Sequence, residues 1–324
     1  MTRAQIIDYI LKSDIFKKWH FFNYHFDFYN KGLEHPLAKS IVDLTFELES
    51  VLPKSGINYI DKIASINDKK NETKHYDQLM QVLAELLIVH KAATYKWGDN
   101  IKLAYEPTAG NSNKNPELTI ATDLLEIGIE VKAPEFNKKH NERATKPQQI
   151  PSRSDIIKIV DKEETMLPRD NPVKDFLISA NKKFEEFKIA NPNFYSVLVI
   201  VWDDFIYEPI SAISSPQAGL FTLNSFAKDD DGNILQFPNL DCVILTRHLL
   251  PIKCGTRDEN LPDFSQHPLD YGREGEFPFK VFIQNPWNNL EMPQEVIDCF
   301  QVLKPGPELG AEYLPSDFIT WFNN

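Results

Sequence analysis

Cysteine is scarce in this sequence, and long apolar runs are missing from it. The 324 residues include three cysteines, Cys242, Cys254 and Cys299. They are too few and too scattered for a disulfide framework, and they lack the close spacing of a zinc site. No apolar stretch approaches the length of a membrane span, and residues 1–5 open an amphipathic segment instead of a signal peptide. We therefore expect a cytoplasmic protein with no membrane partner.

Positive charge is also in short supply. The chain has 35 Lys and Arg residues against 47 Asp and Glu residues, which gives a formal net charge of -12. Neutralising phosphates releases counterions and supplies affinity, so a protein that coats nucleic acid would be basic. The acidity argues less against a metal-dependent nuclease, because such an enzyme needs carboxylates for its metal and can keep a local basic cleft.

Three regions can be distinguished along the chain, whose composition is that of an ordinary globular protein. Apolar residues at helical spacing predict a helical region over residues 1–66. Its aromatic cluster, residues 16–29, could stack on bases, but we favour a packing role. Residues 67–205 are predicted to form the core, and residues 206–324 to complete the sheet and contribute target recognition or dimerisation.

Hydrophobic periodicity predicts how the core is built. A long helix with a broad apolar face is expected from Tyr76 onward. The strands expected after it are Ile101–Tyr105, Glu117–Ala121, Leu124–Lys132, Tyr195–Trp202 and Leu240–Thr246. The second and third of these would form an antiparallel hairpin. Further helices are expected at Asp175–Ala190 and Pro293–Val302, and a polar loop at residues 137–155. This order of elements predicts an α/β core with a mixed sheet.

One pair of residues on the expected hairpin carries chemical interest. Glu130 and Lys132 lie two apart on a strand, so both side chains leave the same face, while the opposite face is apolar. Glu117, on the neighbouring strand, can bring a second carboxylate close to Glu130. Two converging carboxylates repel each other unless a cation lies between them, and hard oxygen ligands suit Mg²⁺. Lys132 could then orient or deprotonate an attacking water, or balance charge in the transition state.

These residues resemble a known signature. Asn115-Pro116-Glu117, followed after an interval by Glu130-Val131-Lys132, is similar to the PD-(D/E)xK motif of the restriction-endonuclease-like superfamily. The resemblance covers roughly residues 76–203. It implies an αβββαβ core with a mixed central sheet, to which N-terminal helices and C-terminal additions are attached. The departure is at position 117, where aspartate is the commonest residue and the longer glutamate shifts the carboxylate oxygens.

The resemblance also implies further site residues and a cofactor. Glu85, in the helix before the strands, matches a helix glutamate that completes the metal site, so Glu117, Glu130 and Glu85 would bind the metal. Gln148 or Gln149 matches a glutamine found after the ExK strand, and we take Gln149 as the candidate. The implied cofactor is Mg²⁺, with Mn²⁺ as a substitute and no organic cofactor.

A basic segment follows the ExK strand. Long polar loops beside a metal site are where a nucleic-acid backbone would be held. The candidate phosphate contacts are Lys138, Lys139, Arg143, Lys146 and Arg153. The alternative is a solvated loop without a partner. His20, His25 and His35 are not spaced in the sequence as metal ligands usually are. We therefore expect them to be hydrogen-bonded inside the protein or exposed at the surface, and not to bind a metal.

The leading hypothesis is a Mg²⁺-dependent endodeoxyribonuclease that hydrolyses phosphodiester bonds of double-stranded DNA, of the restriction type. A homodimer would suit cleavage of both strands of a palindrome. A second hypothesis is a nuclease for RNA or for branched or damaged DNA. A third is a catalytically degenerate protein of the same fold that binds nucleic acid or protein, and the acidic charge and Glu117 both favour it slightly.

Overall fold

The computed structural model describes residues 1–110, 114–146, 148–150, 158–203, 205–273, 275, 277–303 and 319–320. The side chains of residues 138, 144, 319 and 320 lie outside this description. In the part of the chain so described, no helix combines the length and the apolar character needed to cross a membrane.

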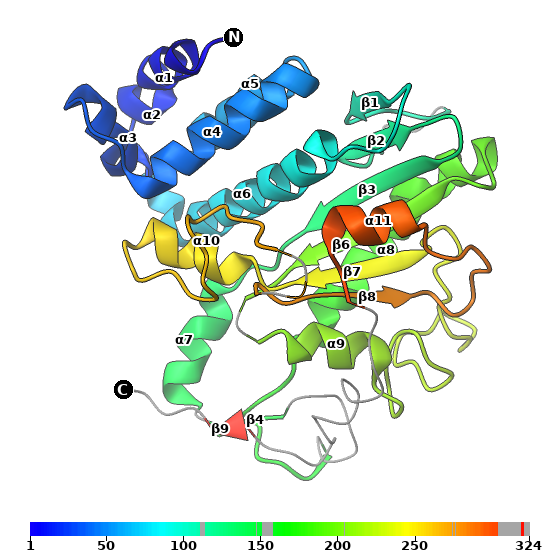
Figure 1. The fold of residues 1–324 in the computed structure, drawn as a ribbon. Helices are drawn as coiled ribbons and strands as arrows, with labels where there is room; N and C mark the ends of the chain where they lie inside the picture. Colours follow the sequence, from blue (N-terminus) through cyan, green and yellow to red (C-terminus); the bar gives the residue numbers. More distant parts are fainter. Residues whose placement is uncertain are drawn as a thin grey trace.

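Helices make up the N-terminal part of the molecule, as predicted (Figure 1). They are α1 (Arg3–Leu11), α2 (Asp14–Lys17), α3 (Asn23–Asn30), α4 (Pro36–Val51), α5 (Ser55–Ser65) and the long α6 (Glu72–Thr94). The Thr2 side chain caps α1, and the His35 side chain caps α4 just before Pro36. Apolar residues of α1, α3, α4, α5 and α6 join one continuous hydrophobic core. The N-terminal helices are therefore packed onto the central region and share its interior.

The centre of the fold is a six-stranded mixed sheet in the order β1-β2-β3-β6-β7-β8. Its strands are β1 (Lys102–Tyr105), β2 (Leu118–Ala121), β3 (Glu126–Lys132), β6 (Tyr195–Val201), β7 (Cys242–Thr246) and β8 (Lys280–Gln284). The hairpin β2/β3 is antiparallel, as predicted, with Leu118 opposite Ile129. β3 pairs with β6 in parallel, so pairing changes from antiparallel to parallel at β3.

Helices cover both faces of this sheet. Ile129 and Val131 of β3 point into the core that contains α6, whereas Leu198 and Ile200 of β6 pack with α8 (Asp170–Ala190). Strand side chains alternate between faces, so Glu130 and Lys132 point to the α8 side. Gly128 lies on that side too, and a Cβ there would be 2.4 Å from the Phe194 ring. The same Cβ would lie 2.8 Å from the ring of Phe184, which belongs to α8, so this helix packs close to β3 beside Glu130.

Further elements complete the described part of the fold. They are α7 (Asn137–Thr145), β4 (Gln148–Gln149), β5 (Thr165–Met166), α9 (Tyr207–Ser214), α10 (Leu249–Thr256), α11 (Gln294–Phe300) and β9 (Ile319–Thr320). β5, β4 and β9 form a second, small sheet. The prediction of a loop over residues 137–155 is wrong for its first part, because Asn137–Thr145 forms the helix α7. This helix has no apolar periodicity that would have indicated it. The helix predicted at residues 293–302 is confirmed by α11.

Candidate functional site

Glu117 and Glu130 lie opposite each other across the β2/β3 hairpin. Leu118 pairs with Ile129, and the Glu117 N–H donates to the Ile129 carbonyl at 3.0 Å, so the next residues in register are Glu117 and Glu130. The Glu130 side chain is completely buried, and that of Glu117 is 10% exposed. Like charges directly opposite in a sheet repel each other. The pair therefore needs cations nearby.

Two lysines supply positive charge to this pair. Lys132 Nζ lies 2.6 Å from Glu130 Oε1. Lys183, from the middle of α8, places its Nζ 2.7 Å from Glu130 Oε1, donates to Glu130 Oε2 at 2.8 Å, and lies 3.7 Å from Glu117 Oε1. The Lys183 ammonium thus bridges the two carboxylates. Within the described residues, Glu130 Oε1 receives no directed hydrogen bond despite these two close ammoniums.

A third lysine approaches Glu117 from the other side. Lys62, near the end of α5, donates to Glu106 at 2.8 Å and lies 3.4 Å from Glu85 and 4.0 Å from Glu117 Oε2. Glu85 lies in α6, the helix before the strands, where the sequence predicted it. The structure therefore brings together four of the predicted site residues, Glu85, Glu117, Glu130 and Lys132. It adds Lys62 and Lys183, which the sequence reasoning missed.

The electrostatics of the cluster follow from burial and crowding. Burial raises the pKa of Glu117 to about 7, and the neighbouring carboxylates Glu85 and Glu130 add to this rise. The pKa of Glu85 is raised as well, first by burial, against the attraction of Lys62. Burial would lower the pKa of Lys132, but the Glu130 carboxylate outweighs it and the net shift is upward. The carboxylates are short of compensating charge, and Lys132 stays an ammonium at neutral pH.

A cleft opens next to this cluster. Its lining includes Gln81, Ala133, Lys139, Leu167 and Phe176, and its volume is about 560 Å³. It begins one residue beyond Lys132 on the chain and one helical turn before Glu85 on α6, where Gln81 donates to the Ala133 carbonyl at 3.0 Å. The side chains of Lys132 and Glu85 are 24% and 23% exposed. The cleft therefore neighbours the cluster along β3 and α6, although none of the carboxylates or lysines of the cluster lines it.

The structure places Gln149 in a different cluster. Its buried amide donates to Glu208 of α9, and Glu208 also pairs with Arg169. Arg169 in turn holds Asp203 with two hydrogen bonds, of 2.7 Å and 3.0 Å. All four side chains are almost completely buried. Burial raises the pKa of Glu208, while Arg169 holds the pKa of Asp203 below its ordinary range against the effect of burial.

The predicted phosphate contacts are mostly engaged within the protein. Lys139 donates to the Leu167 carbonyl at 3.0 Å, and Lys146 donates to the Lys162 carbonyl at 2.7 Å. The Arg143 guanidinium lies 3.1 Å from the centre of the Phe205 ring. The side chain of Lys138 and the whole of Arg153 lie outside the described residues. Among those whose side chains are described, Lys139 lines the cleft.

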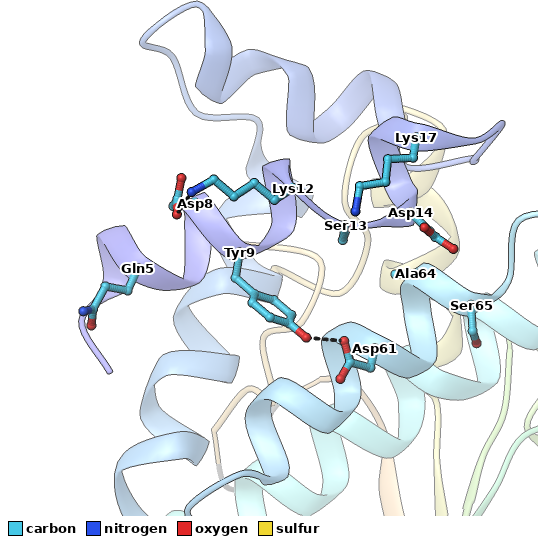
Figure 2. A pocket seen from close by; sticks show the side chains of 10 residues that line it. All are labelled: Gln5, Asp8, Tyr9, Lys12, Ser13, Asp14, Lys17, Asp61, Ala64 and Ser65. Atoms are coloured by element: carbon cyan, nitrogen blue, oxygen red, sulfur yellow. Dashed lines mark hydrogen bonds and ion pairs between the residues drawn. The ribbon is translucent and has the colours of Figure 1, made fainter.

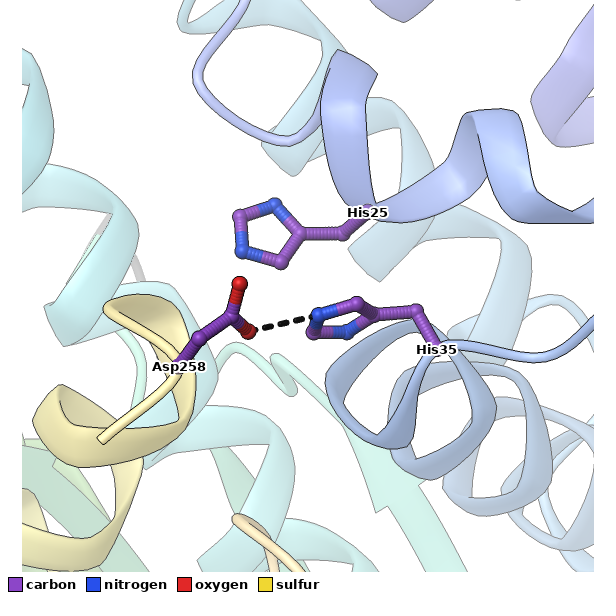
Figure 3. A group of neighbouring side chains, drawn as sticks. All are labelled: His25, His35 and Asp258. Carbon is purple, nitrogen blue, oxygen red and sulfur yellow. Dashed lines mark hydrogen bonds and ion pairs between the residues drawn. The ribbon is translucent and has the colours of Figure 1, made fainter. Parts of the chain in front are cut away.

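Two of the histidines meet an aspartate that is distant in sequence (Figure 3). His25, His35 and Asp258 each offer a ligand atom, and these atoms lie within 4.8 Å of one another. His35 Nδ1 accepts the Leu37 N–H at 3.2 Å, so its ring proton is on Nε2, which donates to Asp258 at 2.7 Å. If a metal bound to Nε2, the ring proton would move to Nδ1. Two N–H donors, of His35 Nδ1 and of Leu37, would then face each other. Hydrogen bonding therefore explains His35, but nothing in the sequence indicated that His25 and His35 would lie at ligand distance from each other and from Asp258.

The cluster makes stability depend on pH through His25. Burial lowers the pKa of His25 from 6.5 to about 4, and His35 adds to this effect, while Asp258 and the carbonyls of Thr256 and Phe21 oppose it. Between these two pKa values, His25 is therefore protonated in the unfolded chain and neutral in the folded chain. As the pH falls from about 6.5 to 4, we expect the free energy of unfolding to lose up to about 3 kcal/mol through this group.

Urea denaturation across that pH range, with wild type and His25→Phe compared, measures this contribution. The variant keeps an aromatic ring and removes the titration, so its stability should fall less on acidification. Equal pH profiles for the two proteins would contradict the assignment.

A groove on the N-terminal helices has a simpler explanation (Figure 2). It is lined by residues of α1, α2 and α5 and the segment between α1 and α2. The Tyr9 hydroxyl donates to Asp61 at 2.7 Å, which raises the pKa of Tyr9, and Lys12 pairs with Asp8 at 2.6 Å. The first of these contacts ties α1 to α5. The groove holds none of the residues of the carboxylate cluster.

Comparisons of the chain with models of known protein families, with curated proteins and with solved structures found no match.

Proposed function

We propose that the chain is a divalent-metal-dependent phosphodiesterase, and that DNA is its substrate. The observation that carries the proposal is the meeting of Glu117 and Glu130 across one hairpin, with Lys132 against Glu130 and Glu85 close by. Carboxylates and an amine in this arrangement are what metal-assisted hydrolysis of a phosphodiester requires. The element order α6, β1, β2, β3, α8, β6 supports the restriction-endonuclease-like core that the motif implies.

The donor set fits Mg²⁺ or Mn²⁺. Glu117, Glu130 and Glu85 offer hard oxygen ligands, and the raised pKa of Glu117 indicates that their negative charge is not fully neutralised. Glu130 Oε1 is buried against the ammonium groups of Lys132 and Lys183, so this carboxylate oxygen already takes part in binding positive charge. When bound, the ion supplies Lewis-acid stabilisation of the charge on the scissile phosphate.

The role of Lys132 follows from its charge. An amine at this position could act as proton acceptor for the attacking water or as electrostatic partner of the reacting phosphate. Glu130 raises the pKa of Lys132, so the side chain carries an ammonium charge beside the carboxylate, and this charge favours the second role. Lys132 would therefore hold the phosphate oxygens and balance the charge that develops as water attacks phosphorus and the P–O ester bond breaks.

A second candidate function is a binding protein without catalysis. The observation that favours it is the complete burial of Glu130, whose two close ion-pair partners are ammonium groups. A buried network of this kind can be structural. The net charge of -12 also weakens non-specific attraction to DNA.

The test is cleavage of supercoiled plasmid DNA by the full chain with Mg²⁺ or Mn²⁺, and with EDTA as the control. We expect nicked or linear products with either metal and none with EDTA. Single-stranded RNA and branched DNA, assayed in parallel, would reveal a different nucleic-acid substrate. Undiminished cleavage in EDTA would contradict the metal-dependent mechanism. If no substrate is cleaved and calorimetry detects no Mn²⁺ binding, the second candidate is favoured.

A further inference from the structure

Lys183 occupies the place between the two carboxylates where a bridging cation would be expected. Its Nζ is 2.7 Å and 2.8 Å from the two oxygens of Glu130 and 3.7 Å from Glu117 Oε1. Lys132, by contrast, contacts Glu130 Oε1 alone among these oxygens. Lys183 is thus the lysine that neutralises the Glu117–Glu130 pair in the structure.

We propose that Lys183 is an internal counter-ion that competes with the divalent metal, so that metal binds only when the Lys183 ammonium leaves the two carboxylates. This inference rests on the proposed function, because it assigns a regulator to the same metal site. A divalent ion between Glu117 and Glu130 would take the bridging position of Lys183 Nζ, and the two positive charges would repel each other strongly there, whereas Lys132 contacts only one oxygen of Glu130. Displacement of Lys183 therefore limits how tightly the site binds metal.

The surroundings of Lys183 allow such a movement. Its side chain is 20% exposed, so it is not enclosed like that of Glu130. It comes from α8 and lies near Glu117 Oε1, whereas Lys62 lies nearer Oε2 and Lys132 contacts Glu130, so the contacts of these two lysines do not depend on Lys183. Glu186 lies one turn further along α8 and is on the same side of the helix. A displaced ammonium would have that carboxylate as a partner near the surface.

The proposal predicts that removal of the Lys183 charge tightens metal binding. Isothermal titration calorimetry of the full chain with Mn²⁺, without nucleic acid, should give at least about a tenfold lower dissociation constant for Lys183→Met than for wild type. The matched control is Lys182→Met, because Lys182 is the exposed neighbour on the same helix and should leave the affinity unchanged. Lys183→Gln is a second variant that keeps a hydrogen-bond donor for Glu130 and should behave like Lys183→Met.

Thermal melting gives a readout that does not depend on activity. In EDTA the Lys183 variants should melt below wild type, because Glu117 and Glu130 then repel each other. Saturating Mn²⁺ should raise their melting temperature more than that of wild type, since the stabilisation by a ligand grows with the logarithm of its concentration divided by the dissociation constant.

The outcomes separate this inference from the proposed function. If wild type binds Mn²⁺ and both Lys183 variants bind it no more tightly, the counter-ion role is wrong and the metal site stands. If neither wild type nor the variants bind Mn²⁺, even with DNA present, both proposals fail.

Discussion

Replacement of Glu130 with glutamine is expected to slow Mg²⁺-dependent plasmid cleavage by at least about 1,000-fold, which corresponds to about 4 kcal/mol of transition-state stabilisation. Glutamine keeps the shape of the side chain and removes its charge. The loss affects the metal, because an anionic ligand disappears, and it affects Lys132, because the partner 2.6 Å away becomes neutral. The rate of conversion of supercoiled plasmid, measured over a range of Mg²⁺ concentrations, checks the expectation.

The control for this variant is Glu126→Gln. Glu126 lies on the same strand and the same face as Glu130, but its carboxylate accepts a hydrogen bond from Asn191 at 2.6 Å and has no described contact with the cluster. This variant should retain cleavage within about twofold. A Glu130→Gln protein that is folded by circular dichroism and cleaves at the wild-type rate would refute the assignment of Glu130. Both proteins need the same purification, so that a contaminating nuclease appears equally in each.

Arg169→Met is expected to destabilise the fold by about 3–5 kcal/mol. Arg169 is 3% exposed and makes two hydrogen bonds to Asp203 and an ion pair with Glu208. Without the guanidinium, two buried carboxyl groups lose their partner, and Asp203 must either keep an uncompensated charge or take up a proton. Chemical denaturation at pH 7 measures the free energy of unfolding.

Two further proteins test the cause of that loss. Lys174→Met alters a neighbouring lysine of α8 whose partner, Asp175, has a side chain that is 66% exposed, and it should change stability by less than about 1 kcal/mol. The triple variant Arg169→Met/Asp203→Asn/Glu208→Gln removes the unpaired charges and should recover a large part of the loss. If the triple variant is as unstable as Arg169→Met, the lost stability comes from packing and not from charge.

Much of the central fold was predictable because its residues repeat with clear periods. Leu125, Ile127, Ile129 and Val131 alternate with polar residues, and this pattern placed Glu130 and Lys132 on one face before the sheet was known. The opposition of Glu117 and Glu130 followed from the hairpin, which the register of Leu118 and Ile129 confirms. Strand β6 and the end of α8 were also predicted close to their observed limits, whereas α8 begins at Asp170, before the predicted start at Asp175.

What was missed depends on distances across the fold. A lysine on an amphipathic helix is ordinarily a solvated residue, so nothing in the local sequence distinguishes Lys183 from its exposed neighbour Lys182. Gln149 was assigned by its position after the ExK strand, yet its partner Glu208 is 59 residues away. Asp258 reaches His35 across 223 residues. Contacts of this kind depend on how the elements pack, and no local pattern reports them.

The backbone register of the β2/β3 hairpin has a consequence for how this chain can change during evolution. Loss or gain of one residue in the turn at 122–125 would exchange the two faces of β3 relative to β2. Apolar side chains would then take the positions of Glu130 and Lys132, and two charges would enter the interior. We therefore expect insertions and deletions to be tolerated in the surface segments around the cleft and to be selected against in this turn. Related chains could then differ in what they bind while the two carboxylates keep their positions.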